Sequence, residues 1–555
     1  MDDYFGKPSD FETMFSLLYT VYSVPNIILP FFGGFFTDKF GARICMIVFC
    51  GFITLGQFIF ALGLSMKSWP VMLLGRVVFG FGGESLGVAN SAILSEWFKG
   101  KELAFAFGIN LSVARLGSVI NNLVSPVLAD DVNIEFALWF GVVLCGSSVL
   151  SAVVIASFDK HFDKLLMDQK GAHGLLLGTE EDEDEEVVLG RGAPLGESLM
   201  GNDKDNEEEE KVPEFREVFD FKHVFWIICA ICVVVYGCVL PFNNIASSLL
   251  LERDYFKEPS DSCHLLIPNQ CEDYPGNYPV DCPSSKWYQP PLPDNATVGG
   301  TFYNPLTTDD IDCTDDLWKD TCTVEYCDRQ NKAQLQAGTI MSIPYIISAV
   351  LSPVLGGLVD RFGYRAVIAT MAPAALVLVH SLLGYTTVSP EGPLVGQGLA
   401  YAGFAAVIWP SVPLVVPQRL VGLAYGVAFS IQNAGLASFP LIIAAIYSDY
   451  GDKYIPSVET FFVIVALVGV LVGIYLNYYD YYYIDSVLNR VHLTPATGDD
   501  LADSDMTNPI HGEENKDKVI KGKVKKFPSD RNEDESDDDD VPVRTTSREL
   551  YANLH

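Results

Sequence analysis

The amino-acid sequence predicts an all-α polytopic membrane protein built from two related helical bundles. Hydrophobic side chains make up 49% of the 555 residues. Apolar runs of about 20 residues or more recur along the chain, and each is long enough to cross about 30 Å of hydrocarbon. One short charged pattern also occurs twice, each time between two such runs. These observations exclude an ordinary soluble enzyme and favour a protein that works inside a bilayer.

Hydropathy along the chain predicts eleven transmembrane helices. The five in the first half are expected at residues 14–36, 44–66, 70–95, 102–125 and 135–158. The six in the second half are expected at 222–248, 334–356, 366–386, 394–416, 420–446 and 459–483. They define an N-terminal bundle, residues 1–158, and a C-terminal bundle, residues 222–486.

Three further segments are acidic: a linker (159–221), a cysteine-rich loop (252–332) within the C-terminal bundle, and a tail (487–555). They hold most of the formal net charge of -34. The linker and the tail have the composition of largely disordered, solvated chain. The charge therefore belongs to connecting segments and says little about a bound ligand.

The repeated pattern, G-x-x-x-D-[K/R]-x-G-x-R, lies in a tight turn between two helices of each half. Its residues are Gly34, Asp38, Lys39, Gly41 and Arg43 in the first half and Gly356, Asp360, Arg361, Gly363 and Arg365 in the second. Glycines let helices approach closely, an aspartate can cap a helix N-terminus, and basic residues hold the turn at the cytosolic face. We expect these residues to stabilise or gate one conformation rather than to contact a substrate.

Basic residues in the short loops predict the orientation of the chain. Lys39 and Arg43, Lys99 and Lys101, Arg361 and Arg365, and Arg419 all fall on alternate turns. The positive-inside rule places these turns in the cytosol, and with them the C-terminal tail. The repeated turn should follow the second helix of each half, but in the first half it follows the first. We therefore infer that one helix is missing upstream of Met1, through an incomplete gene model, an alternative start or a real eleven-helix variant.

The two halves joined by this turn resemble the major facilitator superfamily, in which parallel repeats enclose a substrate site near the bilayer midplane. Residues 75–121 and 409–435 carry a narrower resemblance, to the lysosomal dipeptide uniporters of that superfamily. Their motifs include Gly75-Arg76, Gly82-Gly83-Glu84, Ala114-Arg115, Trp409-Pro410 and Gln432-Asn433. The resemblance implies facilitated movement of dipeptides from an endolysosomal lumen to the cytosol, and a glycosylated lysosomal accessory membrane protein as partner.

Ionisable residues inside the predicted spans point to a substrate class, because such groups usually face a cavity. Glu84 and Arg115 lie near the middle of their spans, and Asn122 shares the Arg115 face of its helix. An arginine binds a carboxylate through a planar fork and a glutamate binds an ammonium group. We hypothesise that Arg115 takes the carboxylate of a short peptide and Glu84 its amino group. The alternative is a structural bridge between the two.

The remaining polar candidates depend on the resemblance. It implies substrate contacts from Trp409 and Gln432 in the second half, where no matching charge lies well inside a span. Helix-to-helix hydrogen bonding is the alternative for either residue. Arg76 matches an arginine that the superfamily often carries in its fourth helix, where it has a structural role or influences a proton site.

Cysteine usage indicates an exported loop. Six of the twelve cysteines lie in the loop 252–332, namely Cys263, Cys271, Cys282, Cys313, Cys322 and Cys327. We expect disulfides among them, with the pairing undecided, and glycosylation at the sequon that begins with Asn295. Cys229 and Cys232 form an isolated C-x-x-C within a span, so we expect no metal site, and no cofactor is expected either.

The C-terminal segment Tyr551–Leu554 fits the tyrosine-based pattern read by sorting adaptors. This favours an endolysosomal membrane, with the plasma membrane as the alternative. The expected function is transport of dipeptides or similar zwitterions by alternating access, with membrane lipid around the bundle and no nucleic-acid partner. Two alternatives stay open: a proton-coupled transporter of organic anions or sugars, and a membrane sensor or scaffold that does not transport.

Overall fold

The computed structural model describes residues 24–98, 102–176, 213–258, 323–451 and 453–491, with parts of 14–22 and of 289–318. All of them belong to one compact unit that ends at Met506. The first half contains η1 (Pro25–Ile27), α3 (Leu29–Phe40), α4 (Ala42–Ser65), α5 (Trp69–Trp97), α6 (Leu103–Asp131) and α7 (Ile134–Leu176).

The second half begins with a short 3-10 helix, η2 (Phe215–Asp220). Its long helices are α8 (His223–Leu250), α11 (Val324–Met341), α12 (Ile343–Phe362), α13 (Arg365–Tyr385), α14 (Glu391–Ser411), α15 (Val421–Asp449) and α16 (Ser457–Tyr483). A π-helical turn, η3 (Leu251–Tyr255), follows α8. Three more 3-10 turns are η4 (Thr308–Asp310), η5 (Val412–Leu414) and η6 (Gln418–Leu420), and the strands β1 (Ala296–Val298) and β2 (Thr301–Tyr303) pair antiparallel.

Ten helical segments among the described residues are long and apolar enough to cross a membrane. They correspond to the ten predicted spans from residue 44 onward. Two extend furthest beyond their predicted bounds: α7 continues to Leu176, and α12 is preceded without a break by α11, which starts at Val324. The first predicted span, 14–36, lies partly outside the described residues, and its described part includes η1 and the start of α3.

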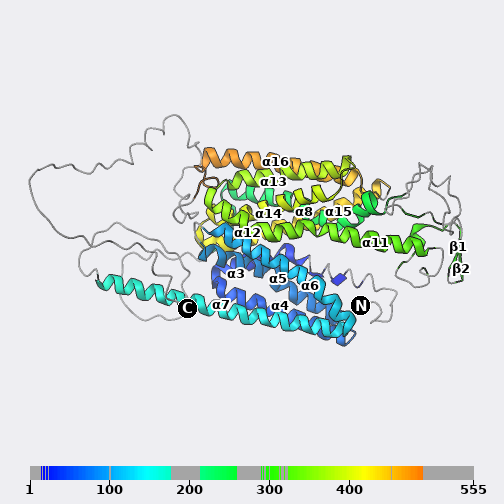
Figure 1. Cartoon of the computed structure of the whole chain (residues 1–555). Coiled ribbons are helices and arrows are strands. Elements are labelled where there is room, and N and C mark those ends of the chain that lie inside the picture. The colour runs from blue at the N-terminus through cyan, green and yellow to red at the C-terminus, as the bar shows by residue number, and fades with distance from the viewer. Residues whose placement is uncertain are drawn as a thin grey trace, which may run out of the picture. The chain divides into compact units, whose positions relative to one another are not determined.

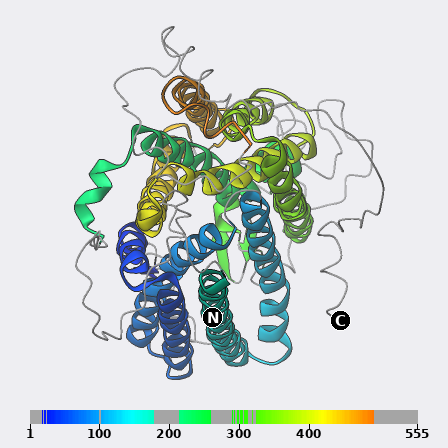
Figure 2. The same cartoon turned by 90° about the vertical axis from the view of Figure 1, so that its left-hand side faces the viewer.

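The helices gather into two groups that follow the order of the sequence. Figure 1 shows α3 to α7 in blue and cyan beside α8 and α11 to α16 in green to orange, and Figure 2 shows the same division after a 90° turn. Across the boundary, α3 packs against α15, and α6 packs against α12 and α14. The sequence repeat therefore corresponds to two bundles that meet along these helices.

The basic turns all lie at one end of the bundle. Successive helices cross in opposite directions, so the turns between α3 and α4, α5 and α6, α12 and α13, and α14 and α15 share that end, which we call the basic end. The strands β1 and β2 lie beyond the opposite end, beside the start of α11 (Figure 1), and we call this the loop end.

Two glycines of the repeated pattern allow the halves to touch at the basic end. A Cβ atom on Gly34 of α3 would lie 2.2 Å from the carbonyl oxygen of Gly422 on α15. A Cβ atom on Gly356 of α12 would lie 2.2 Å from the carbonyl oxygen of Ala104 on α6. Any larger residue would push these helices apart, so the two glycines set the distance between the bundles.

Candidate functional site

The aspartate of the first repeated turn caps a helix of the opposite half. Its two carboxylate oxygens accept hydrogen bonds from the backbone N–H groups of Gly422, at 2.7 Å, and Leu423, at 2.6 Å. These are among the first N–H groups of α15, which have no partner within the helix. Asp38 therefore fastens α3 to α15 through a helix cap, an interaction typically worth about 0.5–2 kcal/mol.

The aspartate of the second turn makes the reciprocal contact. Asp360 of α12 accepts hydrogen bonds from the backbone N–H groups of Ala104, at 3.1 Å, and Phe105, at 2.8 Å, at the start of α6. Buried Arg365 also donates to Asp360 at 3.1 Å. The two turns thus hold the two halves together at the basic end, each through a helix N-terminus of the other half.

The other basic residues of the pattern stay within their own half. Arg43 forms an ion pair with Asp159 on α7, and Asp159 also accepts a hydrogen bond of 2.6 Å from the Trp97 indole at the end of α5. Lys39 lies over aromatic rings, 5.7 Å from the Phe35 centroid. Arg361 likewise lies over the adjacent Phe362. Gly41 and Gly363 both have positive φ, at 86° and 75°, which explains why glycine occupies those positions.

Glu84 is half-buried on α5, where that helix meets α15. Its carboxylate accepts a hydrogen bond from the side chain of Asn433 on α15. The Asn433 amide also donates to the backbone oxygen of Asn26, at 3.1 Å. Glu84 and Arg76 both interact electrostatically with Tyr22, and the Arg76 guanidinium stacks 4.4 Å from the Phe60 ring. Glu84 thus lies in a polar group shared by α5, α15 and the segment before α3.

Arg115 is half-buried on α6 and lies against the second half. Its guanidinium carbon is 3.9 Å from the Tyr401 ring centroid on α14 and 6.0 Å from that of Tyr345 on α12. Among the described residues no ion pair joins Arg115 to Glu84, so the alternative of a structural bridge between them is not what the structure shows.

The two charges nevertheless lie at similar depth. Arg115 follows the start of α6 by twelve residues, and Glu84 precedes the end of α5 by thirteen. At 1.5 Å per residue they are about 18 and about 20 Å from the basic end. A carboxylate and a guanidinium are therefore available near mid-depth, each with its own neighbours.

A row of aromatic side chains from the second half connects the surroundings of the two charges. Phe429 lies next to Gly87 of α5, the helix that carries Glu84. It stacks on Trp409 with a centroid distance of 4.6 Å. The Trp409 indole donates a 2.8 Å hydrogen bond to the Tyr236 hydroxyl, and Tyr236 packs edge-on against Tyr401 at 5.8 Å. We call Phe429, Trp409, Tyr236 and Tyr401 the aromatic row.

The other predicted contacts are placed as follows. Trp409 is buried, and its indole N–H makes a hydrogen bond between two helices, which is the alternative to a substrate contact. Gln432 is half-buried on α15, and its side-chain oxygen has no hydrogen-bond partner in the part of the chain that the structure describes. Asn122 lies on α6, but its side chain is outside the described residues.

The second half also buries ionisable side chains that the sequence analysis did not single out. His380 on α13 and Glu459 on α16 are both fully buried, and His380 Nδ1 lies 2.8 Å from a Glu459 carboxylate oxygen. Asp480 of α16 is buried as well and accepts a 2.8 Å hydrogen bond from the backbone of Leu488. Glu459 lies at the very start of its predicted span.

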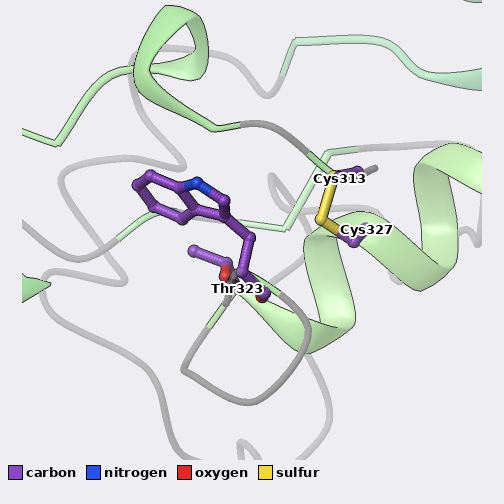
Figure 3. Close-up of a disulfide and its surroundings, with 4 residues drawn as sticks. Cys313, Thr323 and Cys327 are labelled. Carbon is purple, nitrogen blue, oxygen red and sulfur yellow. Dashed lines mark hydrogen bonds between the residues drawn. A yellow bond between two sulfur atoms is a disulfide. The ribbon is translucent and has the colours of Figure 1, made fainter. Parts of the chain in front are cut away.

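Within the described part of the loop end, a disulfide joins Cys313 to Cys327 at the start of α11, with a Cα–Cα distance of 5.2 Å (Figure 3). Disulfide formation in this loop is thereby confirmed for one pair. In the same loop, hydrogen bonds from Thr307 lower the pKa of Asp310. The remaining expectations for Cys263, Cys271, Cys282, Cys322, Asn295 and Tyr551–Leu554 lie outside the described residues.

Two helical bundles, fastened reciprocally at one end and carrying separate opposite charges at mid-depth, define a membrane transporter rather than an enzyme. A family model described as "Major Facilitator Superfamily" matches residues 9–251 and 329–491. The chain belongs to this superfamily.

Curated relatives narrow the comparison. The chain is 29% identical over 462 residues to the human protein named "Lysosomal dipeptide transporter MFSD1", covering 81% of this chain and 75% of that one. It is 28% identical over 479 residues to the zebrafish (Danio rerio) protein of the same name, covering 84% and 79%.

Solved structures support the fold. The human organic anion transporter MFSD10 matches with a TM-score of 0.51 and 13% identity, over 85% of this chain and 87% of that one. The transporter FucP, solved in an outward conformation, matches with a TM-score of 0.52 and 11% identity, over 84% and 91%. At these identities the matches show the fold alone.

Proposed function

We propose that this transporter moves dipeptides or similar small zwitterions across a lysosomal or endolysosomal membrane. The observation that carries the proposal is the pair of separate charges at one depth. Arg115 presents the planar donors that bind a carboxylate in two places, and Glu84 presents the acceptor that an ammonium group needs. The similarity to proteins named lysosomal dipeptide transporters supports the same substrate class.

Two charges that are not paired with each other favour a ligand that carries both signs. A zwitterion offers an opposite charge to each of the two groups at once, which would offset the cost of holding them away from water. A peptide of two residues separates its amino and carboxylate groups by a few bonds, which suits charges on two different helices. The transporter would select only weakly among the side chains of its substrates, since the aromatic row between the two groups carries no charge.

The proposed direction of transport follows from the difference between the basic end and the loop end. The positive-inside rule assigns the basic end, and with it the C-terminal tail, to the cytosol, and the disulfide suits a lumenal loop. With the caps of Asp38 and Asp360 in place, the structure fits the state that accepts substrate from the lumen. Movement to the cytosol would follow a concentration gradient without ion coupling, with an accessory glycoprotein and a sorting adaptor as partners.

Uptake of radiolabelled alanyl-alanine into proteoliposomes tests the proposal. We expect Glu84→Gln and Arg115→Gln each to reduce the flux at least tenfold, because each leaves one charged end of the peptide without its partner. The matched controls are Glu325→Gln and Arg329→Gln, which alter an opposite-charge pair near the start of α11 and should leave the flux unchanged. Wild-type flux in either of the first two variants would contradict the proposal.

A further inference from the structure

The Arg115 charge rests on the face of a tyrosine that belongs to the other half of the molecule. The guanidinium carbon lies 3.9 Å from the centroid of the Tyr401 ring, with Tyr345 at 6.0 Å. A guanidinium that rests on a ring by its flat face keeps N–H donors at its edge with which it can bind a carboxylate. The ring therefore supports the charge without occupying the groups that would bind a carboxylate.

The Tyr401 ring is itself held firmly. Its side chain is buried, and Tyr236 packs against it at an interplanar angle of 89°. Tyr236 is fixed in turn by the hydrogen bond from the Trp409 indole and by an edge-on contact with Phe404 at 5.7 Å. A ring supported from α8 and α14 has little freedom to follow Arg115, so it can define where the guanidinium lies.

We propose that Tyr401 is the positioning residue for substrate recognition, and that it presents the edge of the Arg115 guanidinium to the peptide carboxylate. This inference rests on the proposed function. A desolvated cation–π stack corresponds to roughly a tenfold to thirtyfold change in affinity. A side chain oriented before binding also loses less conformational freedom when the ligand arrives.

The same geometry couples binding to the arrangement of the halves. Arg115 belongs to α6 of the first half and Tyr401 to α14 of the second. The proposed carboxylate site, made of Arg115 and the Tyr401 ring, is complete only while α6 and α14 keep their present positions relative to each other. A free carboxylate should therefore bind more tightly in the state closed at the basic end than after the halves shift at this level.

Equilibrium binding to the purified full chain tests the proposal, with alanyl-alanine and alanyl-alanine amide as probes. Tyr401→Phe keeps the ring and should change both affinities by less than about twofold. Fluorinated phenylalanines at position 401 keep the shape but weaken the negative face. We expect two changes at position 401, trifluorinated phenylalanine and Tyr401→Leu, to lower the affinity for alanyl-alanine by about tenfold. The affinity for alanyl-alanine amide should stay unchanged. The control is Tyr475→Leu, at an exposed tyrosine of α16.

Equal losses for acid and amide, or no loss along the fluorinated series, would overturn the role of Tyr401. The isosteric series decides the question even when the leucine variant fails to fold. Arg115→Gln in the same assay separates this inference from the proposed function. Should Arg115→Gln leave the preference for the free acid intact, the proposed carboxylate site itself fails. Should it abolish the preference while the Tyr401 variants do not, only the tyrosine inference fails.

Discussion

Gly34 and Asp38 act together at the boundary between the halves. The absence of a side chain at Gly34 lets the backbone of α3 reach the start of α15, and this approach brings the Asp38 carboxylate within 2.7 Å of the Gly422 N–H. The cap depends on the close approach, and the approach is stabilised by the cap. A change of one methyl group should therefore affect both.

We expect Gly34→Ala to impair transport by about tenfold or more, because overpacking of this kind typically costs about 1–3 kcal/mol and here falls on the closed state. The added Cβ would lie 2.2 Å from a backbone oxygen rather than from the end of a flexible side chain. The measurement is proteoliposome uptake of alanyl-alanine. Gly51→Ala on α4 is the matched control, since no atom lies within 4 Å of its new Cβ. Equal flux in the two variants would show that the approach is not needed.

The roles of single residues were partly predictable from the sequence. The repeated pattern indicated a capping aspartate, but Gly422, whose N–H it caps, lies 384 residues later in the chain, and no local signal identifies that helix. Counting residues along helices gave the similar depth of Glu84 and Arg115. Asn433 and Tyr401 are their neighbours because of the way the two bundles pack against each other. Hydropathy along the chain carries no information about that packing.

Among the helices, α13 and α16 are joined by the buried pair of His380 and Glu459. The His380 ring also stacks on Phe462 at 4.8 Å and meets the edge of Phe242 at 5.2 Å. An ionisable pair in such apolar surroundings is costly to break, because removal of one partner leaves the other buried without compensation. The pair therefore specifies how these two helices lie against each other.

We expect His380→Leu alone to destabilise the chain by about 3–5 kcal/mol, since the Glu459 carboxylate would stay buried without its partner. The double variant His380→Leu with Glu459→Leu should recover most of that loss. Thermal unfolding in detergent measures both. A double variant as unstable as the single one would mean that the pair is not the source of the loss.

Helix boundaries show what hydropathy can and cannot predict. The span expected at 366–386 is α13 at Arg365–Tyr385, because apolar side chains begin and end with the helix there. The span expected to end at 158 continues as α7 to Leu176, through a charged segment. Hydropathy reports where a chain can lie in lipid, whereas a helix continues wherever backbone propensity and its own hydrogen bonds allow.

Across the whole molecule, the described polar contacts between the halves extend from the basic end to mid-depth. Above the two caps, Ser95 of α5 lies 2.8 Å from the Tyr425 hydroxyl of α15, and Asn433 reaches the backbone of Asn26. The repeat in the sequence predicted that there are two halves, because a repeat and its hydropathy are local properties. Which contacts close one end is a property of both halves together and appears only in the structure.

Recognition of the two ends of a peptide by two separate charges is tested most directly by a crossed set of ligands and variants. Binding of alanyl-alanine, its N-acetyl derivative and its C-terminal amide is measured for the wild type, Glu84→Gln and Arg115→Gln. We expect the wild type to bind both blocked peptides more weakly than alanyl-alanine. Glu84→Gln should lose only the discrimination against N-acetylation, and Arg115→Gln only that against amidation. If both variants weaken all three ligands equally, Glu84 and Arg115 do not read opposite ends of the substrate, and the account is contradicted.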